Sequence, residues 1–175
     1  MRRVRSGLTL VALVAVLLAA SAAGAQPRKI IVDQDARGPA TTDMQSILLF
    51  LQAKDVEVLG ITIVTGDQWL KEQTQRTLRA IEIAQRTDVP VVPGAEYPLI
   101  NTKELSEAWE QQYGEFSFKG AWTPRLYHPP DVVPPLEEGN PTIKAIDEHA
   151  ANFIIRMVRQ YPNEVTIWAG ASFPA

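Results

Sequence analysis

The stretch VDQDARGPATTDMQSILLFL, residues 32–51, places three aspartates between two apolar runs. Asp33 and Asp35 follow Lys29–Val32, a short β-branched run that predicts a buried strand. Asp43 opens the second run, in which apolar residues recur every three or four positions, as in an amphipathic helix. Like carboxylates repel one another and raise the pKa of a neighbour unless a cation compensates. The stretch therefore predicts a strand-to-helix junction with an acidic site, which we interpret as a site for a divalent metal.

The residue types at this junction allow two interpretations. Calcium binds carboxylate and carbonyl oxygens, and Asp35 and Asp43 can face each other across the turn at Gly38. Acidic residues before a helix can equally form a capped and solvated loop, with Thr41 or Thr42 as the N-cap. Both a metal site and a capped loop remain open on the residues alone.

Outward from the junction, strand and helix patterns alternate along the chain. Apolar runs predict strands at 56–64, 89–92 and 165–169, and helical spacing predicts helices at 43–54, 69–86 and 142–160. This alternation predicts an α/β fold, a parallel sheet flanked by helices in a Rossmann-like arrangement. Ligands of such sheets bind beyond the carboxyl ends of the strands, where Asp33, Asp35 and Asp67 are placed.

Residues 95–141 do not follow the alternation. The segment is rich in proline and aromatic residues and has one weak helical pattern, Lys103–Tyr113. Connections of this length within a compact domain are usually functional or mobile. Its His128 is interpreted either as a solvated loop residue or as a contact to a ligand. His149, at the start of a helical stretch, is expected to be structural.

The first 25 residues are expected to be a cleaved signal peptide. A basic start precedes the apolar stretch Leu8–Ala20, and small residues at 23–25 form a cleavage site before Gln26. The apolar stretch is shorter than the roughly 20 residues that a membrane-spanning helix needs. We therefore expect residues 26–175 to be exported, to the periplasm or outside the cell, with no stable membrane anchor after cleavage.

Composition limits the class of protein. Removing the three arginines of the first 25 residues leaves 14 of the 17 basic residues against 20 acidic ones, a net charge of −6. No basic stripe is available to neutralise phosphates, which argues against nucleic acid as a partner. The absence of cysteine excludes disulfides, zinc–thiolate sites and thiol catalysis. Residues 26–175 suit a single domain, which must be stabilised by its core.

The junction also carries a motif. Asp33-Gln34-Asp35 ends a predicted strand, and Thr42-Asp43 opens a helix after a glycine-proline turn. The segments DVEVLGITIVTGD (55–67), QRTDVPVVPGAEYPL (85–99) and HAANFIIRMVRQYPNEVTIWAG (149–170) follow in order. Together these segments resemble the inosine–uridine nucleoside hydrolase family, whose N-terminal signature is D-x-D, a turn and a D-D pair. The resemblance covers most of residues 26–175.

The resemblance implies a calcium-dependent hydrolase that cleaves the N-glycosidic bond of a nucleoside or another ribosyl substrate. It implies that Asp35 is the catalytic base and a calcium ligand, that Asp43 is a bidentate calcium ligand, and that Asp33 belongs to the same metal site. Thr42 and Asp67 stand where the family has an aspartate that faces ribose and an asparagine, so both are expected to contact substrate. A homo-oligomer is left open.

Departures from the family pattern keep other functions open. The segment from Asp35 to Asp43 is longer than usual, and FKGAWTPRLYHPPD (118–131) replaces a His-Gly-x-x-Gly loop. The alternatives are a non-catalytic module that binds metal and sugar, and a hydrolase of another glycosidic substrate. The tryptophans that are candidates to stack on a base are Trp69, Trp109 and Trp122, whereas Trp168 is expected in the core.

The chain is expected to be incomplete at its C-terminus. Family members are longer and have a Gly-Pro-x-Thr-Asn turn where this chain has WAGASFPA (168–175). Without a covering helix, the strand at 165–169 is expected to leave an apolar surface exposed beside Ile167 and Trp168. Residues 26–175 alone are therefore expected to bind metal weakly, to associate and not to hydrolyse nucleosides.

Overall fold

Four parallel strands form a single sheet at the centre of the computed structural model, which describes residues 26–124 and 128–170. The order across the sheet is β3-β2-β1-β4. The strands are β1 (Arg28–Gln34), β2 (Val56–Ile63), β3 (Val91–Pro93) and β4 (Val165–Ala169). The predicted α/β class is confirmed. The predicted signal peptide, residues 1–25, lies outside the described residues.

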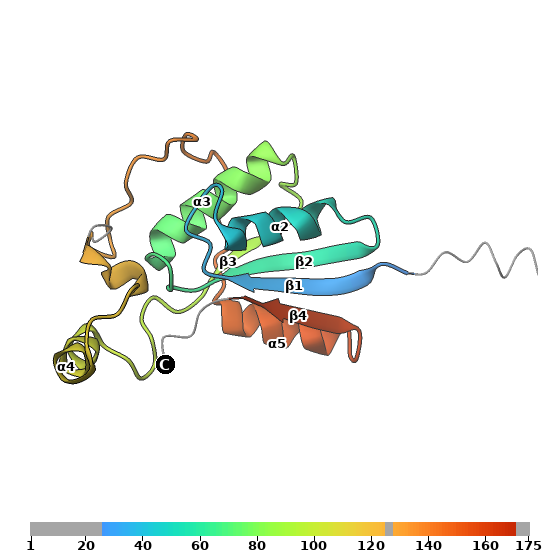
Figure 1. The fold of residues 1–175 in the computed structure, drawn as a ribbon. Coiled ribbons are helices and arrows are strands. Elements are labelled where there is room, and N and C mark those ends of the chain that lie inside the picture. The colour runs from blue at the N-terminus through green and yellow to red at the C-terminus, as the bar shows by residue number, and fades with distance from the viewer. Residues whose placement is uncertain (1–25, 125–127, 171–175) are drawn as a thin grey trace, which may run out of the picture.

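Helices cover both faces of the sheet (Figure 1). One face carries α2 (Thr42–Gln52) and α3 (Leu70–Ile83), and the other carries α5 (Ala150–Gln160). The helix α4 (Lys103–Tyr113) and the 3-10 turn η1 (Gly120–Trp122) lie away from the sheet. In the described part of the chain, no helix has the length and apolar character needed to span a membrane.

Two layers of buried side chains hold this arrangement together. Ile47 of α2 and Ile81 of α3 pack with Val32 and Ile61 on one face. On the other face, Phe153 of α5 is 2% exposed, and a Cβ added at Gly60 of β2 would lie 2.5 Å from its ring. Burying a large apolar side chain contributes about 1.5–3 kcal/mol. Since both faces are covered, the strands are nearly continuous apolar runs rather than alternating ones.

The predicted helix over 142–160 is wrong in its first part, because α5 begins at Ala150. Residues before it use their amides elsewhere: Thr142 N donates to Glu82 Oε1 at 2.6 Å, and Ile146 N donates to the Val91 carbonyl at 3.1 Å. His149 is the N-cap, and its Nδ1 accepts from Ala151 N at 3.2 Å. The structural role expected for His149 is confirmed.

Strand β4 forms one edge of the sheet. Ile167 is 45% exposed, as expected for this edge. The Trp168 ring packs against Phe50 of α2, with ring centroids 5.2 Å apart, and belongs to the partly buried margin of the core. Trp168 therefore packs between β4 and α2, whereas its neighbour Ile167 is exposed.

Residues 94–149, here named the long connection, join β3 to α5 and contain α4 and η1. The connection exposes large apolar side chains, with Leu99 and Ile100 more than four-fifths exposed. Trp109 stacks on Phe116 with ring centroids 4.4 Å apart. The connection thus adds little to the core of the sheet.

Candidate functional site

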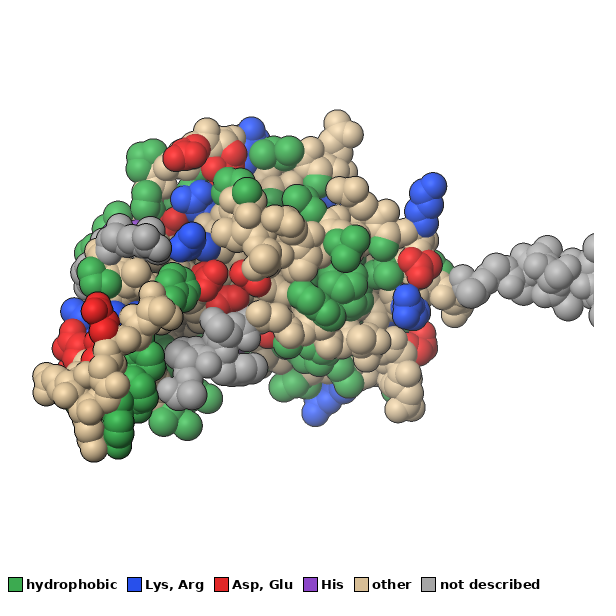
Figure 2. Space-filling view, in the orientation of Figure 1, with side chains coloured by type: hydrophobic (Ala, Val, Ile, Leu, Met, Phe, Trp, Pro, Cys, Tyr) green, Lys and Arg blue, Asp and Glu red, His purple; other side chains and the backbone are tan. Residues whose placement is uncertain are grey.

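The carboxyl ends of β1 and β2 are neighbours because the two strands pair in parallel. Asp35 follows β1 directly, and Gly66 and Asp67 follow β2. Figure 2 shows acidic side chains gathered over this end of the sheet. The site therefore lies where a ligand of a parallel α/β sheet is expected.

Asp35 is 2% exposed and is held by the loop after β2. The Asp67 amide donates to Asp35 Oδ2 at 3.1 Å. A Cβ added at Gly66 would overlap the Asp35 carboxylate, so a glycine is required for this close approach. A buried carboxylate with a fixed orientation can accept a proton from a positioned water.

Asp67 lies in the field of two other carboxylates. Burial is the largest cause that raises the pKa of Asp67 to about 6, and the charges of Asp35 and Asp43 act in the same direction, against the opposing charge of Arg37. Asp35, Asp43 and Asp67, each a candidate from the sequence, are thus electrostatically coupled at this end of the sheet. A cation there would relieve the repulsion.

Asp33 faces a different partner. Its Oδ1 accepts from the Thr62 hydroxyl at 2.5 Å, across the β1–β2 pair. Burial raises the pKa of Asp33 and this hydrogen bond lowers it. Burial is the larger cause, so the pKa of Asp33 is raised, and one oxygen of its carboxylate is engaged by β2.

Thr42 and Asp43 form the first turn of α2. Thr42 is exposed and Asp43 half-buried. Thr41 is the N-cap by position, but its hydroxyl donates to the Gly38 carbonyl at 2.7 Å instead of capping the helix. An aspartate in the first turn of a helix is stabilised by the helix dipole, which favours the position of Asp43 even without a metal.

The acidic residues have the charge and the oxygen donors that a divalent cation requires. Carboxylate oxygens are the donors that calcium prefers. Within residues 26–124 and 128–170, no group of three or more Asp, Glu or His side chains is arranged to hold a metal ion. The expected convergence of Asp33, Asp35 and Asp43 is not seen among these residues, and Asp33 Oδ1 accepts from Thr62. Their assignment as ligands stays a prediction.

A polar group on α3 was missed by the sequence analysis. His128 Nε2 lies 2.7 Å from Glu72 Oε2, and Trp69 Nε1 donates to the His128 carbonyl at 2.6 Å. Glu72 also pairs with Arg76 at 2.8 Å, and its side chain is only 4% exposed. The interpretation of His128 as a solvated residue is wrong. The i,i+4 spacing of Glu72 and Arg76 was the available signal.

Gln34 was also missed as a notable residue. Its side chain is fully buried, and among the described residues neither amide atom has a hydrogen-bond partner. A Cβ added at Gly170 would overlap its Nε2. Buried polar atoms nearly always have a hydrogen-bond partner. The Gln34 amide at the carboxyl end of β1 is therefore an exception that costs folding free energy.

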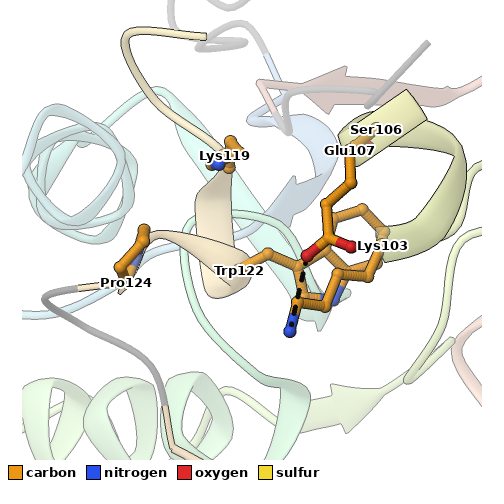
Figure 3. Close-up of a pocket in the computed structure, with 6 residues that line it drawn as sticks. All are labelled: Lys103, Ser106, Glu107, Lys119, Trp122 and Pro124. Carbon is orange, nitrogen blue, oxygen red and sulfur yellow. Dashed lines mark ion pairs between the residues drawn. The ribbon is translucent and has the colours of Figure 1, made fainter. Parts of the chain in front are cut away.

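A pocket of about 260 Å³ lies between α4 and η1 (Figure 3). Of the three tryptophans considered as stacking groups, Trp122 lines this pocket. Trp69 is 3% exposed and edge-on to Tyr97, and Trp109 stacks on Phe116. The pocket is lined by Lys103, Ser106, Glu107, Lys119, Trp122 and Pro124, with Lys103 and Glu107 paired at 3.7 Å.

The fold and the acidic group define an α/β protein with a polar site at the carboxyl ends of a parallel sheet. The profile of the family "Inosine-uridine preferring nucleoside hydrolase" matches residues 30–173. The chain therefore belongs to this family, as the resemblance implied.

Individual relatives agree with the family. The chain is 33% identical to "Probable uridine nucleosidase 1" of Oryza sativa subsp. japonica, covering 81% of this chain and 37% of the rice protein. It is 32% identical to "Inosine-uridine preferring nucleoside hydrolase" of Crithidia fasciculata, covering 81% of this chain and 39% of that protein. The chain thus spans well under half the length of these relatives.

Solved structures show the same fold. The chain superposes on "Plant nucleoside hydrolase - PpNRh1 enzyme" with a TM-score of 0.55 and 22% identity, covering 82% of this chain and 39% of that one. It superposes on "Inosine-Guanosine Nucleoside Hydrolase (IG-NH)" with a TM-score of 0.53 and 23% identity, covering 81% of this chain and 38% of that one. The nucleoside-hydrolase-like fold class is confirmed.

Proposed function

We propose that this chain carries the proton-accepting side of the active site of an exported, calcium-dependent nucleoside hydrolase. One observation carries the proposal: the buried Asp35 carboxylate is oriented by the Asp67 amide at the carboxyl end of the sheet. Family membership supports hydrolysis of an N-glycosidic bond. The names of the relatives from rice and Crithidia support uridine and inosine as the first substrates to test.

In the proposed reaction, Asp35 accepts a proton from a water molecule. The water oxygen bonds to the anomeric carbon of ribose, and the bond from that carbon to the base nitrogen breaks. The departing base keeps the bonding electron pair and takes up a proton. The hydrogen bond from Asp67 N keeps Asp35 from rotating away, which a proton acceptor of fixed geometry requires. Thr42 and Asp67 remain the proposed contacts to the sugar.

The experiment is release of free base from uridine and inosine. We would measure it for residues 26–175 and for a chimera in which residues 30–170 replace the matching segment of the rice relative. The chimera is expected to release base, and Asp35→Asn is expected to lower its rate by about 10²–10⁴-fold. Equal rates with Asp and Asn would reject Asp35 as the base. Nucleoside binding without hydrolysis by either protein would favour the non-catalytic module.

Calcium dependence has its own test. The support for it is electrostatic, since Asp35 and Asp43 both raise the pKa of Asp67. Calorimetric titration with calcium would compare the wild type with Asp43→Ala, and Asp55→Ala, at an exposed position paired with Arg28, is the control. We expect a weaker affinity in Asp43→Ala alone. Equal affinity in all three proteins would reject Asp43 as a ligand.

Export is proposed from the basic start, the apolar stretch and the small residues of the first 25 positions. The measurement is the N-terminal sequence of the protein recovered from outside the cytoplasm, which is expected to start at Gln26. Recovery of the intact N-terminus from the cytoplasm would contradict the proposal.

A further inference from the structure

Two turns carry the acidic residues of the site. Residues 36–41, here named the Gly38 turn, lead from Asp35 to the helix that begins with Thr42 and Asp43. Residues 65–69, here named the Gly66 turn, carry Asp67 and contact Asp35. The relative position of the two turns therefore sets the distances between the carboxylates.

The Gly38 turn rests on Arg76 of α3. Gly38 is buried, with φ of 144°, and a Cβ there would lie 2.8 Å from Arg76 Cδ and 3.0 Å from its Nη1. The turn closes on itself through Thr41, whose hydroxyl donates to the Gly38 carbonyl. Ala40 also has a positive φ, of 63°, which costs energy in a residue other than glycine. A strained turn of this kind keeps its shape only where its surroundings impose it.

Arg76 is itself fixed by the long connection. Its Nε donates to Glu72 Oε1 at 2.8 Å, and its Nη1 donates to Glu138 Oε1 at 3.3 Å. Glu72 also pairs with His128, whose Nε2 lies 2.7 Å from Glu72 Oε2. The Arg76 side chain is 16% exposed and the Glu72 side chain 4%, so these pairs are partly shielded from water. Charge-assisted hydrogen bonds that are partly shielded from water are stronger than exposed surface pairs.

The Gly66 turn rests on a second part of the long connection. The Ala121 amide of η1 donates to the Gly66 carbonyl at 2.9 Å. Gly120 has φ of 55°, and a Cβ there would overlap the same carbonyl oxygen. The backbone of η1 is therefore in direct contact with the turn that orients Asp35.

We propose that the long connection positions both acidic turns of the site, with Arg76 as a positioning residue for the Gly38 turn and η1 for the Gly66 turn. That this arrangement serves catalysis rests on the proposed function. The contacts of Arg76 and η1 with the two turns do not depend on that function. Although the long connection contributes little to the core, it holds Asp35, Asp43 and Asp67 in one arrangement.

The test compares Arg76→Met, Arg76→Lys and Arg79→Met in the full chain. Arg79→Met is the matched control, because Arg79 also joins α3 to Glu138 but bonds to Glu82 rather than supporting the Gly38 turn. Hydrogen exchange would report the amides of residues 36–45. The ¹H–¹⁵N resonance of Asp67, whose amide donates to Asp35, would report the geometry of the site.

Arg76→Met is expected to speed exchange in residues 36–45 by about tenfold, because the side chain that supports the Gly38 turn loses its hydrogen bonds to both Glu72 and Glu138, and to shift the Asp67 resonance. Arg76→Lys, which can keep the pair with Glu72, is expected to restore part of both effects and serves if the Met variant does not fold. Arg79→Met is expected to leave the Asp67 resonance in place.

Unchanged exchange and an unchanged Asp67 resonance in a folded Arg76 variant would overturn the proposal. Equal shifts in Arg79→Met would overturn it too, because the effect would then be a general loosening of α3. Neither readout requires turnover. A wild type that hydrolyses no nucleoside would therefore reject the proposed function while these measurements still decide the role of Arg76.

Discussion

The sheet and the long connection are held in place by different forces. In the sheet and the helices that cover it, side chains such as Ile31, Ile61 and Phe153 are almost completely buried. In the long connection, apolar side chains such as Leu99 and Ile100 remain exposed. It contacts α3 through polar groups of His128, Glu138 and Thr142, while Ile143 and Ala145 add apolar contacts to the core beside α3.

Because of this difference, the sheet mainly determines the stability of the protein, and the long connection mainly determines the geometry of the site. Apolar burial is non-directional and supplies most of the folding free energy, so the sheet tolerates small displacements but not the loss of volume. Hydrogen bonds and ion pairs contribute less, but they define direction. Substitutions in the sheet should therefore unfold the protein, whereas substitutions in the long connection should move the carboxylates of a protein that stays folded.

The largest effect is expected for Phe153→Ala. The ring lies over Gly60, where a side chain at position 60 would have to move it, so its removal leaves a cavity in the core. We expect a loss of about 3–5 kcal/mol in the free energy of unfolding, measured by urea denaturation.

Phe116→Ala is the control from the long connection. Phe116 is 38% exposed and stacks on Trp109 of α4, away from the core of the sheet. Its removal is expected to cost about 0.5–1.5 kcal/mol, the value of an aromatic pair. Equal losses for the two variants would show that the long connection carries core packing and would break the comparison.

A smaller effect is expected for Gly120→Ala. The new Cβ would overlap the Gly66 carbonyl oxygen, so the Gly66 turn must move away from η1. We expect a loss of about 1–3 kcal/mol, typical of overpacking, together with a shifted Asp67 amide resonance.

Gly114→Ala is the matched control, because Gly114 also has a positive φ, of 103°, but has nothing within 4 Å of an added Cβ. It carries the backbone strain of a side chain at positive φ without the clash. A shifted Asp67 resonance in Gly114→Ala as well would contradict the role given to η1.

The regular part of the fold could be predicted from the sequence because its signals are local. Apolar spacing identified α2, α3 and the four strands, and the parallel sheet then brought Asp35 and Asp67 to one edge. The spacing at Thr142–Gln160 suggested a longer helix, but Glu82 takes up the amides of Thr142 and Ile143. A contact across 60 positions leaves no periodic trace near Thr142.

The site was predicted only in part for the same reason. The position of Asp35 follows from the end of β1, a local feature. The orientation of Asp33 depends on Thr62, which the strand register places opposite it. The bond between His128 and Glu72 joins segments whose approach depends on the path of the long connection. Contacts of this second kind require the three-dimensional structure.

The smallest effect sharpens the comparison through pH, because two carboxylates respond in opposite directions. Donors from Thr142, Ile143 and Arg79 hold the pKa of Glu82 at about 2, below its ordinary 4.5. Its contribution to stability is therefore present above pH 4.5 and is lost as the pH falls toward 2.

Burial and the charges of Asp35 and Asp43 raise the pKa of Asp67 from 3.8 to about 6. The folded state then binds this proton more tightly, so the contribution of Asp67 to stability is fully present below pH 3.8 and is lost as the pH rises through 6. Urea denaturation from about pH 2 to 7 should show that Glu82→Gln removes the acid-side loss, whereas Asp67→Asn removes the loss between pH 3.8 and 6. If Asp67→Asn leaves the profile above pH 3.8 unchanged, burial and the charges of Asp35 and Asp43 do not raise the pKa of Asp67, and the carboxylates of the site are not coupled as described.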